Sequence, residues 1–276
     1  MAKKSWKQFR KYKSGLIGLL IIGIFLTIAI FAPFIAPHNP NKTHLLHTLE
    51  PPSFDSPLGR DQLGRDILSR IIFGTRTSFL IGGMATGIAS IIGIILGLLA
   101  GFYGGIIDNV IMRTVDIMLS FPEFLVAMIV VGILGPGFYN VIFSISIIFV
   151  PRFVRLVRAS TLSIKENDYI EAAVSIGAGT PRILFKHILP NGIAPAIVQG
   201  TLLIGYAVTI AAGLGFLGLG AQPPLSEWGA MLSDGRAYIA TAPHIATFPG
   251  LAIMLMVIGF NLVGDSLRDF LDVQLT

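Results

Sequence analysis

Long runs of uncharged, mostly apolar residues constrain the fold of this chain more than any other feature. A bilayer core about 30 Å thick requires a helix of about 20 apolar residues to cross it. Segments of this character lie at 15–36, 77–107 (with the helix ending near Gly101), 113–134, 139–152, 193–219 and 248–264. They predict an all-α integral membrane protein with six transmembrane helices.

The composition also argues against a soluble protein. Of the 276 residues, 53% are hydrophobic and 13% are charged, whereas a soluble domain carries about 25% charged residues. The net charge of +5 could indicate a nucleic-acid partner. The basic residues cluster beside the apolar runs, however, so we exclude nucleic acid and expect membrane lipid around the chain. The absence of cysteine excludes disulfides and thiolate metal sites.

Basic residues predict the orientation of the chain. The segment 1–14 holds a cluster of lysines and arginines directly before the first apolar run. That run is too long for a secretory signal peptide and no small-residue cleavage motif follows it, so we expect a retained helix. With six spans, most of the 20 basic residues fall on the side of this cluster. The positive-inside rule then places both termini in the cytoplasm.

The segment 37–76 is expected outside the membrane. It contains a short tandem repeat of Leu-Gly-Arg-Asp. After Asp66 the apolar residues fall on one helical face, and Asp66 and Arg70 are spaced to pair at i, i+4. We expect an amphipathic helix that lies at the outer membrane surface. It either caps an outward pathway or serves only as a lead-in to the second span.

The polar segment between the fourth and fifth spans has the pattern of two short helices. A stripe of small and apolar residues recurs at helical spacing at Tyr169, Ala172, Ala173 and Ile176. Gly177 and Gly179 end this helix. Thr180 as cap and Pro181 as first residue begin a second helix, which Pro190 closes. The resulting elbow either docks a partner through Ala172 and Ala173 or is a structural loop.

Two features inside the spans have alternative interpretations. Arg113 and Asp116 are expected to pair at the cytoplasmic boundary, although with Asp108 and Glu123 they could form a proton relay. The Gly82-Gly83-x-x-x-Gly87 pattern predicts close packing within one bundle, with a dimer seam as the alternative.

The elbow resembles the EAA motif of ABC importer permeases. The matching residues are Glu171-Ala172-Ala173-x-x-x-Gly177 and, nine residues later, His187-Ile188-Leu189-Pro190. The family has an aliphatic residue where His187 stands. Stretches at 58–70 (with Arg60 in place of the usual threonine), 215–229 and 261–269 resemble the peptide and nickel branch of that family. The likeness covers nearly the whole chain and is closest to the C-type permease subunit of dipeptide and oligopeptide importers.

This resemblance implies a type I importer fold in the cytoplasmic membrane of a prokaryote. It divides the chain into a basic cytoplasmic N-terminus (1–14), a first helix (15–36), an extracytoplasmic segment (37–76) and a five-helix core (77–276) with a cytoplasmic coupling segment (159–192). A homologous second permease would form a heterodimer with this chain. Two cytoplasmic ATPases would dock beneath, and an extracytoplasmic binding protein would deliver the substrate.

The resemblance also assigns roles within the elbow. It implies that the ATPase-coupling residues are Asp168, Glu171, Ala172, Ala173, Gly177 and Arg182. Glu171 would pair with a basic residue of the ATPase, and Gly177 would allow a sharp turn. ATP and Mg²⁺ would be bound by the partner ATPases, so this chain is expected to need no cofactor and to be no enzyme itself.

Missing motifs narrow the function classes. No Gly-x-x-x-x-Gly-Lys-Ser/Thr phosphate loop and no His-Glu-x-x-His zinc motif occur. An ion-driven secondary transporter is an alternative, although matching repeat halves are not visible, and a membrane-embedded enzyme is the weakest one. His38, His44 and His47 could contact a metal, but loosely spaced histidines more often have no shared role. Peptide cargo is favoured, with nickel or a metal chelate as the alternative.

Overall fold

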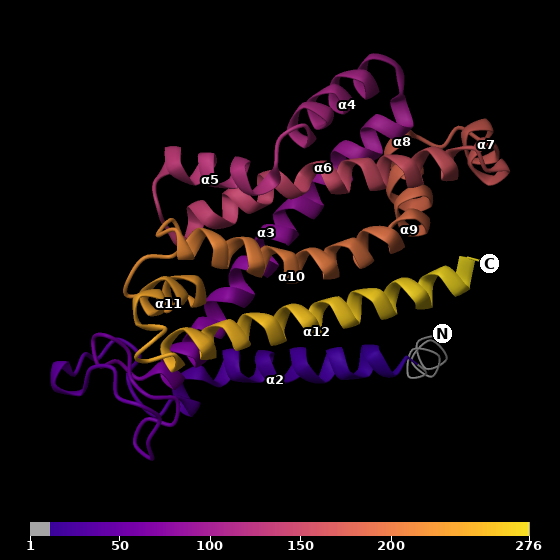
Figure 1. Cartoon of the computed structure of the whole chain (residues 1–276). Coiled ribbons are helices and arrows are strands. Elements are labelled where there is room, and N and C mark those ends of the chain that lie inside the picture. The colour runs from indigo at the N-terminus through magenta and orange to yellow at the C-terminus, as the bar shows by residue number, and fades with distance from the viewer. Residues whose placement is uncertain (1–11, 276) are drawn as a thin grey trace.

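The computed structural model of the chain describes residues 12–275, with side chains through residue 271, and the described part is a bundle of long helices (Figure 1). Within residues 12–275, five helices are long and apolar enough to cross a membrane. They are α2 (Lys13–Ile35), α3 (Ile67–Tyr103), α6 (Phe138–Lys165), α10 (Ala194–Phe216) and α12 (His244–Leu275). Most of the basic N-terminal cluster, namely Lys3, Lys4, Lys7, Arg10 and Lys11, lies outside the described residues.

The sixth span is broken. Helices α4 (Gly105–Leu119) and α5 (Glu123–Leu134) are long and apolar enough to cross a membrane only when taken together, and the chain bends by 91° between them. Pro122 precedes α5 and has no N–H to continue a helix. The sequence predicted one span at 113–134, but α5 alone, at about 1.5 Å per residue, covers only about 18 Å. The all-helical fold with six spans is thus confirmed if the bent pair counts as one.

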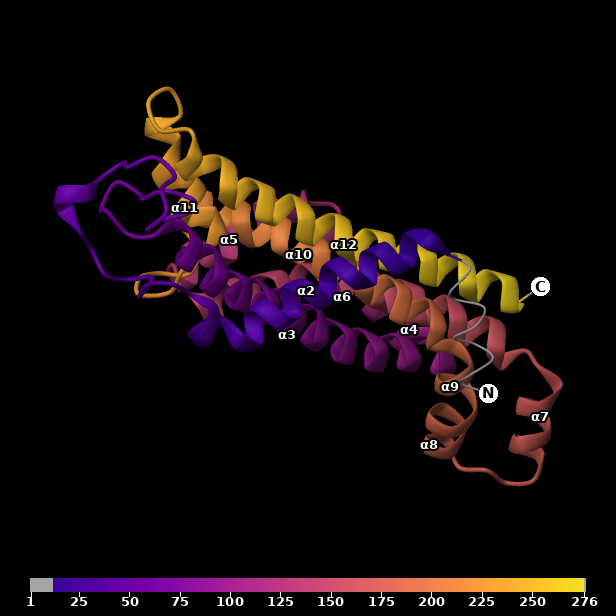
Figure 2. The same ribbon diagram turned by 90° about the horizontal axis from the view of Figure 1, so that it is seen from below.

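The bundle has two distinct ends. Helices α7 (Asp168–Ser175), α8 (Thr180–Arg182) and α9 (Leu189–Gly192) form one of them, which we call the elbow end (Figure 1). The beginning of α2 and the end of α12 lie there too, and Tyr12 donates its hydroxyl to the Asp269 carbonyl at 3.4 Å. The segment 37–66, with a short 3₁₀ turn at Leu45–His47, forms the opposite, loop end together with α11 (Trp228–Gly235) and the 3₁₀ turn Arg236–Tyr238 (Figure 2).

A stripe of glycines joins α3 to α6. A Cβ added at Gly93 would lie 2.3 Å from the Phe153 Cβ, and one at Gly97 would lie 2.8 Å from the Val157 Cβ. Small residues let helices approach closely in this way. Of the glycines at 82–87, which were predicted to allow close packing, only Gly82 lies against another helix, namely α10. Cβ atoms added at 83 and 87 would meet nothing within 4 Å.

Helix α3 begins well before its membrane-crossing part. It runs without interruption from Ile67, so the residues expected to lie flat on the membrane surface lead directly into the second span. Asp66 caps the helix by accepting hydrogen bonds from the backbone N–H and hydroxyl of Ser69, at 2.8 and 2.6 Å. The predicted Asp66–Arg70 pair is therefore wrong. Arg70 instead donates to Asp61.

Buried charges hold the loop end together. Asp61 accepts from Arg65 at 2.7 Å and from Arg70, and Arg65 also lies 3.4 Å from Asp234 of α11. The Glu227 carboxylate caps α11 by accepting from the N–H groups of Gly229 and Ala230, both at 2.7 Å. Burial raises the pKa of Glu227 to about 7, against the opposing effect of these two N–H donors.

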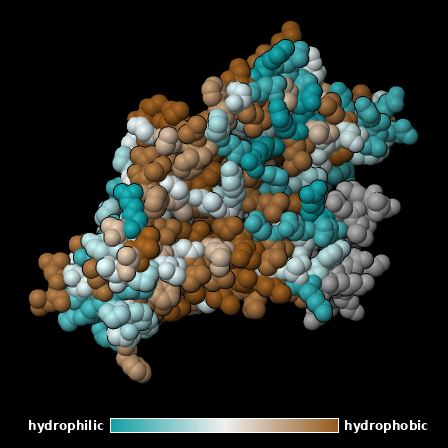
Figure 3. Space-filling model, viewed as in Figure 1, coloured by the Kyte–Doolittle hydropathy of each residue, from teal (hydrophilic) through white to brown (hydrophobic). Residues whose placement is uncertain are grey.

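Ion pairs across helices replace the pair expected within α4. Asp116 lies 2.6 Å from Arg155 of α6, so the predicted Arg113–Asp116 pair is wrong. Figure 3 shows hydrophobic side chains over the middle of the bundle and hydrophilic ones gathered over α4 and the adjoining part of α6.

Candidate functional site: the helical elbow

The elbow connects α6 to α10 through four short helical segments. After α7, the chain turns at 176–179 and returns through α8, a π-helical turn at Ile183–Ile188 and α9. Asn167 joins α6 to α7, because its side-chain amide donates to the carbonyl of Ile164 at 2.9 Å. The turn between α7 and α8 projects beyond the bundle (Figures 1 and 2).

Gly177 makes the turn that ends α7. Its φ angle is +79°, in the left-handed region that glycine occupies without strain. Its N–H donates to the Val174 carbonyl at 2.9 Å, and the next N–H, of Ala178, donates to the Ala173 carbonyl at 3.0 Å. This is the hydrogen-bond pattern of a Schellman C-cap. The prediction that Gly177 permits a sharp turn is confirmed.

The inner side of the elbow packs on the main hydrophobic core. Ile170 of α7 and Ile183 and Leu184 of the π-helical turn are buried in that core. Ala173 belongs to this side, with 7% of its surface exposed. The expectation that Ala172 and Ala173 share an exposed face is therefore wrong, because α7 turns only Ala172 outward.

The outer side of the elbow is apolar and exposed. Ile176 has 86% of its surface exposed, and large exposed side chains also stand at Tyr169, Val174 and Phe185. Sequence reasoning missed Val174 and Phe185, although both are large apolar residues in an otherwise polar segment. Such a patch on a protein surface marks an interaction site.

Charged residues surround this apolar face. Asp168 and Glu171 lie exposed in the first turn of α7, where negative charge is favoured by the helix dipole. Arg182 lies exposed at the end of α8. Within residues 12–275 these three side chains form no ion pair with one another or with any other residue. They are therefore available to a partner of mixed charge.

Two details of the elbow differ from the expectation. Gly179, rather than Thr180, is the N-cap of α8, and Pro181 lies within its first two positions. Pro190 does not close the second helix, because the helical structure continues through α9 to Gly192.

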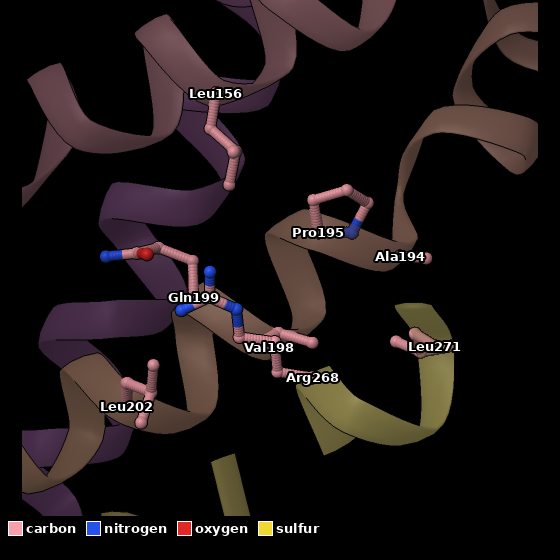
Figure 4. A pocket seen from close by; sticks show the side chains of 8 residues that line it. All are labelled: Leu156, Ala194, Pro195, Val198, Gln199, Leu202, Arg268 and Leu271. Atoms are coloured by element: carbon pink, nitrogen blue, oxygen red, sulfur yellow. The ribbon is translucent and has the colours of Figure 1, made fainter. Parts of the chain in front are cut away.

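A cavity opens beside the elbow, between α6, α10 and α12. Its volume is about 300 Å³, and its apolar wall includes Leu156 and Leu271. Figure 4 shows the guanidinium of Arg268 beside the side chain of Gln199 within it.

The three histidines of the outer segment do not form a metal site. His38 lies 3.6 Å from Asp55, and His47 lies 2.6 Å from Glu50. Among the described residues, no group of three or more His, Cys, Asp or Glu side chains could hold a metal ion.

Comparison with known proteins places the chain in a family. Residues 93–275 match the profile of the "binding-protein-dependent transport system inner membrane component" family. The chain belongs to this family of transport permeases. Residues 1–52 also match the N-terminal transmembrane domain of oligopeptide transport permease C. The permease is therefore a C-type transmembrane subunit of an ABC importer in the dipeptide and oligopeptide branch, a multi-pass protein of the inner membrane.

Full-length relatives agree with this assignment. The permease is 48% identical to the dipeptide transport system permease DppC of Alkalihalophilus pseudofirmus, covering 99% of this chain and 90% of that protein. It is 46% identical to the di/tripeptide permease DppC of Pseudomonas aeruginosa, covering 99% and 92%. It is also 46% identical to the glutathione permease GsiD of Shigella flexneri, covering 98% and 89%.

A solved structure supports the fold. The permease matches a chain of the inward-facing MetNI methionine ABC transporter with a TM-score of 0.59 and 20% identity. The match covers 73% of this chain and 96% of that one. The type I importer fold expected from the sequence is thus confirmed.

Proposed function

We propose that this permease moves di- and oligopeptides across the cytoplasmic membrane as one half of a heterodimer with a homologous second permease. An extracytoplasmic binding protein delivers the peptide, and two cytoplasmic ATPases supply the energy. The names of the relatives, which specify dipeptide, di/tripeptide and glutathione transport, support short peptides as the cargo. None of these relatives is named for nickel.

One observation carries the proposed link to the ATPases, namely the exposed apolar face of the elbow with its unpaired charges. Ile176 and Phe185 are large apolar side chains that lie largely exposed, and an exposed apolar patch marks an interaction site. Glu171 pairs with a basic residue of the ATPase, and Asp168 and Arg182 flank the contact. Ala172 allows close approach from outside, whereas Ala173 anchors α7 to the core from inside.

This permease itself binds no ATP, so the energy of ATP hydrolysis reaches it through contact with the ATPases. The elbow is that contact. ATP and Mg²⁺ are held by the ATPases, and this chain needs no cofactor and performs no chemical catalysis. Closure of the ATPases moves the two elbows together, and the rigid bundles then rock between inward- and outward-facing states. This arrangement requires the elbow end and both termini to lie in the cytoplasm.

Reconstituted uptake tests the proposal. The complete complex in vesicles, supplied with its binding protein, should accumulate a labelled dipeptide when ATP is present and should not do so with a proton or sodium gradient alone. Uptake of Ni²⁺ in place of peptide would contradict the cargo. Uptake driven by an ion gradient without ATP would contradict the energy source.

A variant pair tests the docking face. Ile176→Glu adds a charge to the exposed apolar face and should abolish co-purification of the ATPases. Leu46→Glu is the matched control, because Leu46 is also largely exposed but lies at the loop end. Retention of the ATPases by Ile176→Glu would contradict the assignment of the elbow.

A further inference from the structure

An ion pair and a tyrosine meet where α5, α6 and α10 approach one another. Arg152 of α6 donates from Nε and Nη2 to the two carboxylate oxygens of Glu123, both at 2.8 Å. Its guanidinium carbon lies 5.1 Å from the ring centroid of Tyr206 on α10. The Tyr206 ring stacks in turn on Phe149, with centroids 5.8 Å apart. The arginine is thus held by a bidentate carboxylate on one side and by an aromatic face on the other.

With the loop end of the bundle at one membrane surface, the lengths of α10 and α5 place these groups near the middle of the bilayer. A helical rise of about 1.5 Å per residue places Tyr206 about 15 Å from Phe216, where α10 ends, and Glu123 about 16 Å from Leu134, where α5 ends. Both helix ends belong to the loop end of the bundle (Figure 1). A depth of about 15 Å is half of a hydrocarbon core about 30 Å thick.

The ion pair is partly exposed at the surface of this chain. The side chain of Arg152 is 36% exposed and that of Glu123 is 16% exposed, while Tyr206 is 37% exposed. Charged groups at this depth do not face lipid, because their desolvation in hydrocarbon is too costly. The face of α6 that carries Arg152 therefore borders either water or another subunit.

Two more pairs extend this polar face toward the elbow end. Arg155 lies 2.6 Å from Asp116, and Arg158 binds Asp108 through Nη2 at 2.6 Å. The arginines recur at every third position of α6, and each faces an acid of the α4–α5 pair. Figure 3 shows the hydrophilic surface that results over α4 and α6. A polar track therefore leads from the elbow end to the middle of the bundle and ends at Glu123, Arg152 and Tyr206.

We propose that Glu123, Arg152 and Tyr206 form a mid-membrane binding station for the charged termini of a zwitterionic peptide. This inference rests on the proposed peptide cargo. Arg152 binds the terminal carboxylate of the cargo, and Glu123 binds its terminal ammonium, while Tyr206 keeps the guanidinium in place. Without cargo the two side chains neutralise each other, so neither charge stays buried and unpaired.

The chemistry of the station favours a zwitterion over a metal cation. A zwitterion replaces one ion pair by two and leaves the net charge of the site at zero. A free divalent cation would gain Glu123 but would be repelled by the guanidinium of Arg152.

The test compares peptides that differ only at their termini. Vesicles contain the complete complex and receive ATP and the binding protein. The probes are a dipeptide with free termini, the same dipeptide as a C-terminal amide, and its N-acetyl form. For each peptide the uptake of a variant is divided by that of the wild type, so the preference of the binding protein cancels.

Arg152→Gln should lower the uptake of the free dipeptide at least about tenfold, since a charge-assisted hydrogen-bonded pair is lost. It should affect the C-terminal amide much less. Glu123→Gln should show the converse selectivity, sparing the N-acetyl peptide. Arg155→Gln is the matched control, because it removes the next arginine of the same helix and should lower the uptake of all three peptides equally or not at all.

Equal losses for all three peptides in both Arg152→Gln and Glu123→Gln would overturn the station and leave only a structural ion pair. If either single variant fails to assemble, the double variant Glu123→Gln with Arg152→Gln leaves no unpaired charge. Its uptake relative to the wild type should fall more for the free dipeptide than for the amide or the N-acetyl peptide. Equal relative uptake of the three peptides by the double variant would also overturn the inference. Absence of peptide uptake by the wild-type complex would instead contradict the proposed function itself.

Discussion

The backbone of Gly177 has a φ angle of +79°, and a Cβ added there would meet no other atom within 4 Å. A substitution at this position is therefore strained by its backbone conformation and not by crowding. Gly179, two residues later, has an ordinary φ of −68°. The two glycines of this turn thus differ in their φ angle, which decides whether a residue with a side chain fits there without strain.

Gly177→Val should uncouple ATP hydrolysis from transport, because a β-branched residue in the left-handed region costs at least about 1–2 kcal/mol and distorts the end of α7. Binding-protein-stimulated ATPase activity and peptide uptake are measured on the same assembled complex. Gly179→Ala is the control and should behave like the wild type. Normal assembly and transport by Gly177→Val would contradict the coupling role of the elbow.

Glu227 makes the loop end sensitive to pH. The carboxyl group has an ordinary pKa of 4.5 when unfolded and a pKa of about 7 when folded, because it is buried. The folded state therefore binds more protons between these values. The contribution of Glu227 to the free energy of unfolding is fully present below about pH 4.5 and is lost as pH rises through about 7.

The free energy of unfolding of the loop end should fall by up to about 3 kcal/mol between pH 4.5 and pH 7.5, given about 1.4 kcal/mol per pKa unit. Fluorescence of Trp228, which follows Glu227 in the chain and packs against α3, reports the transition. Glu227→Gln has no charge to bury and should show a flatter profile. A wild-type profile as flat as that of the variant would contradict the prediction.

At the scale of elements, the close contact between α3 and α6 depends on glycines, which have no side chain. A Cβ at Gly97 would lie 2.8 Å from the Val157 Cβ and 2.9 Å from the Val154 carbonyl oxygen. Neither neighbour can move without shifting a helix. The close approach of these two helices in turn fixes the position of the α6 arginines relative to α4 and α5.

Gly97→Val should lower the melting temperature of the purified permease clearly, because overpacking a tight interface costs about 1–3 kcal/mol or more. Gly87→Val lies on the same helix, where an added Cβ meets nothing, and should change it little. Equal shifts for the two variants would show that helix propensity, rather than packing, determines the effect.

Several elements could be predicted from the sequence because their signals are local. Uncharged runs gave the spans, and Gly177 marked the end of α7. The bend at 120–122 was missed, since acids on both sides of it suggested only a membrane boundary. Spacing along one helix predicted Arg113 as the ion-pair partner of Asp116, whereas the actual partner, Arg155, belongs to another helix. Which of Ala172 and Ala173 is buried likewise depends on how α7 packs against the returning turn.

At the scale of the whole molecule, the two ends of the bundle should lie on opposite sides of the membrane. The chain contains no cysteine, so a single introduced one is unique. Leu46→Cys at the loop end should react with a membrane-impermeant maleimide added to intact cells. Ile176→Cys at the elbow should react only after permeabilisation. The reverse pattern of labelling would invert the proposed orientation.

Pro151 lies inside α6, directly before Arg152. Because proline has no N–H, the carbonyl of Ile147 loses its helical donor at this level. This missing hydrogen bond lets α6 bend more easily here than elsewhere along its length, although α3 packs on both sides of this level. A movement of the elbow would therefore reach Arg152 and Glu123 through the part of α6 that bends most easily.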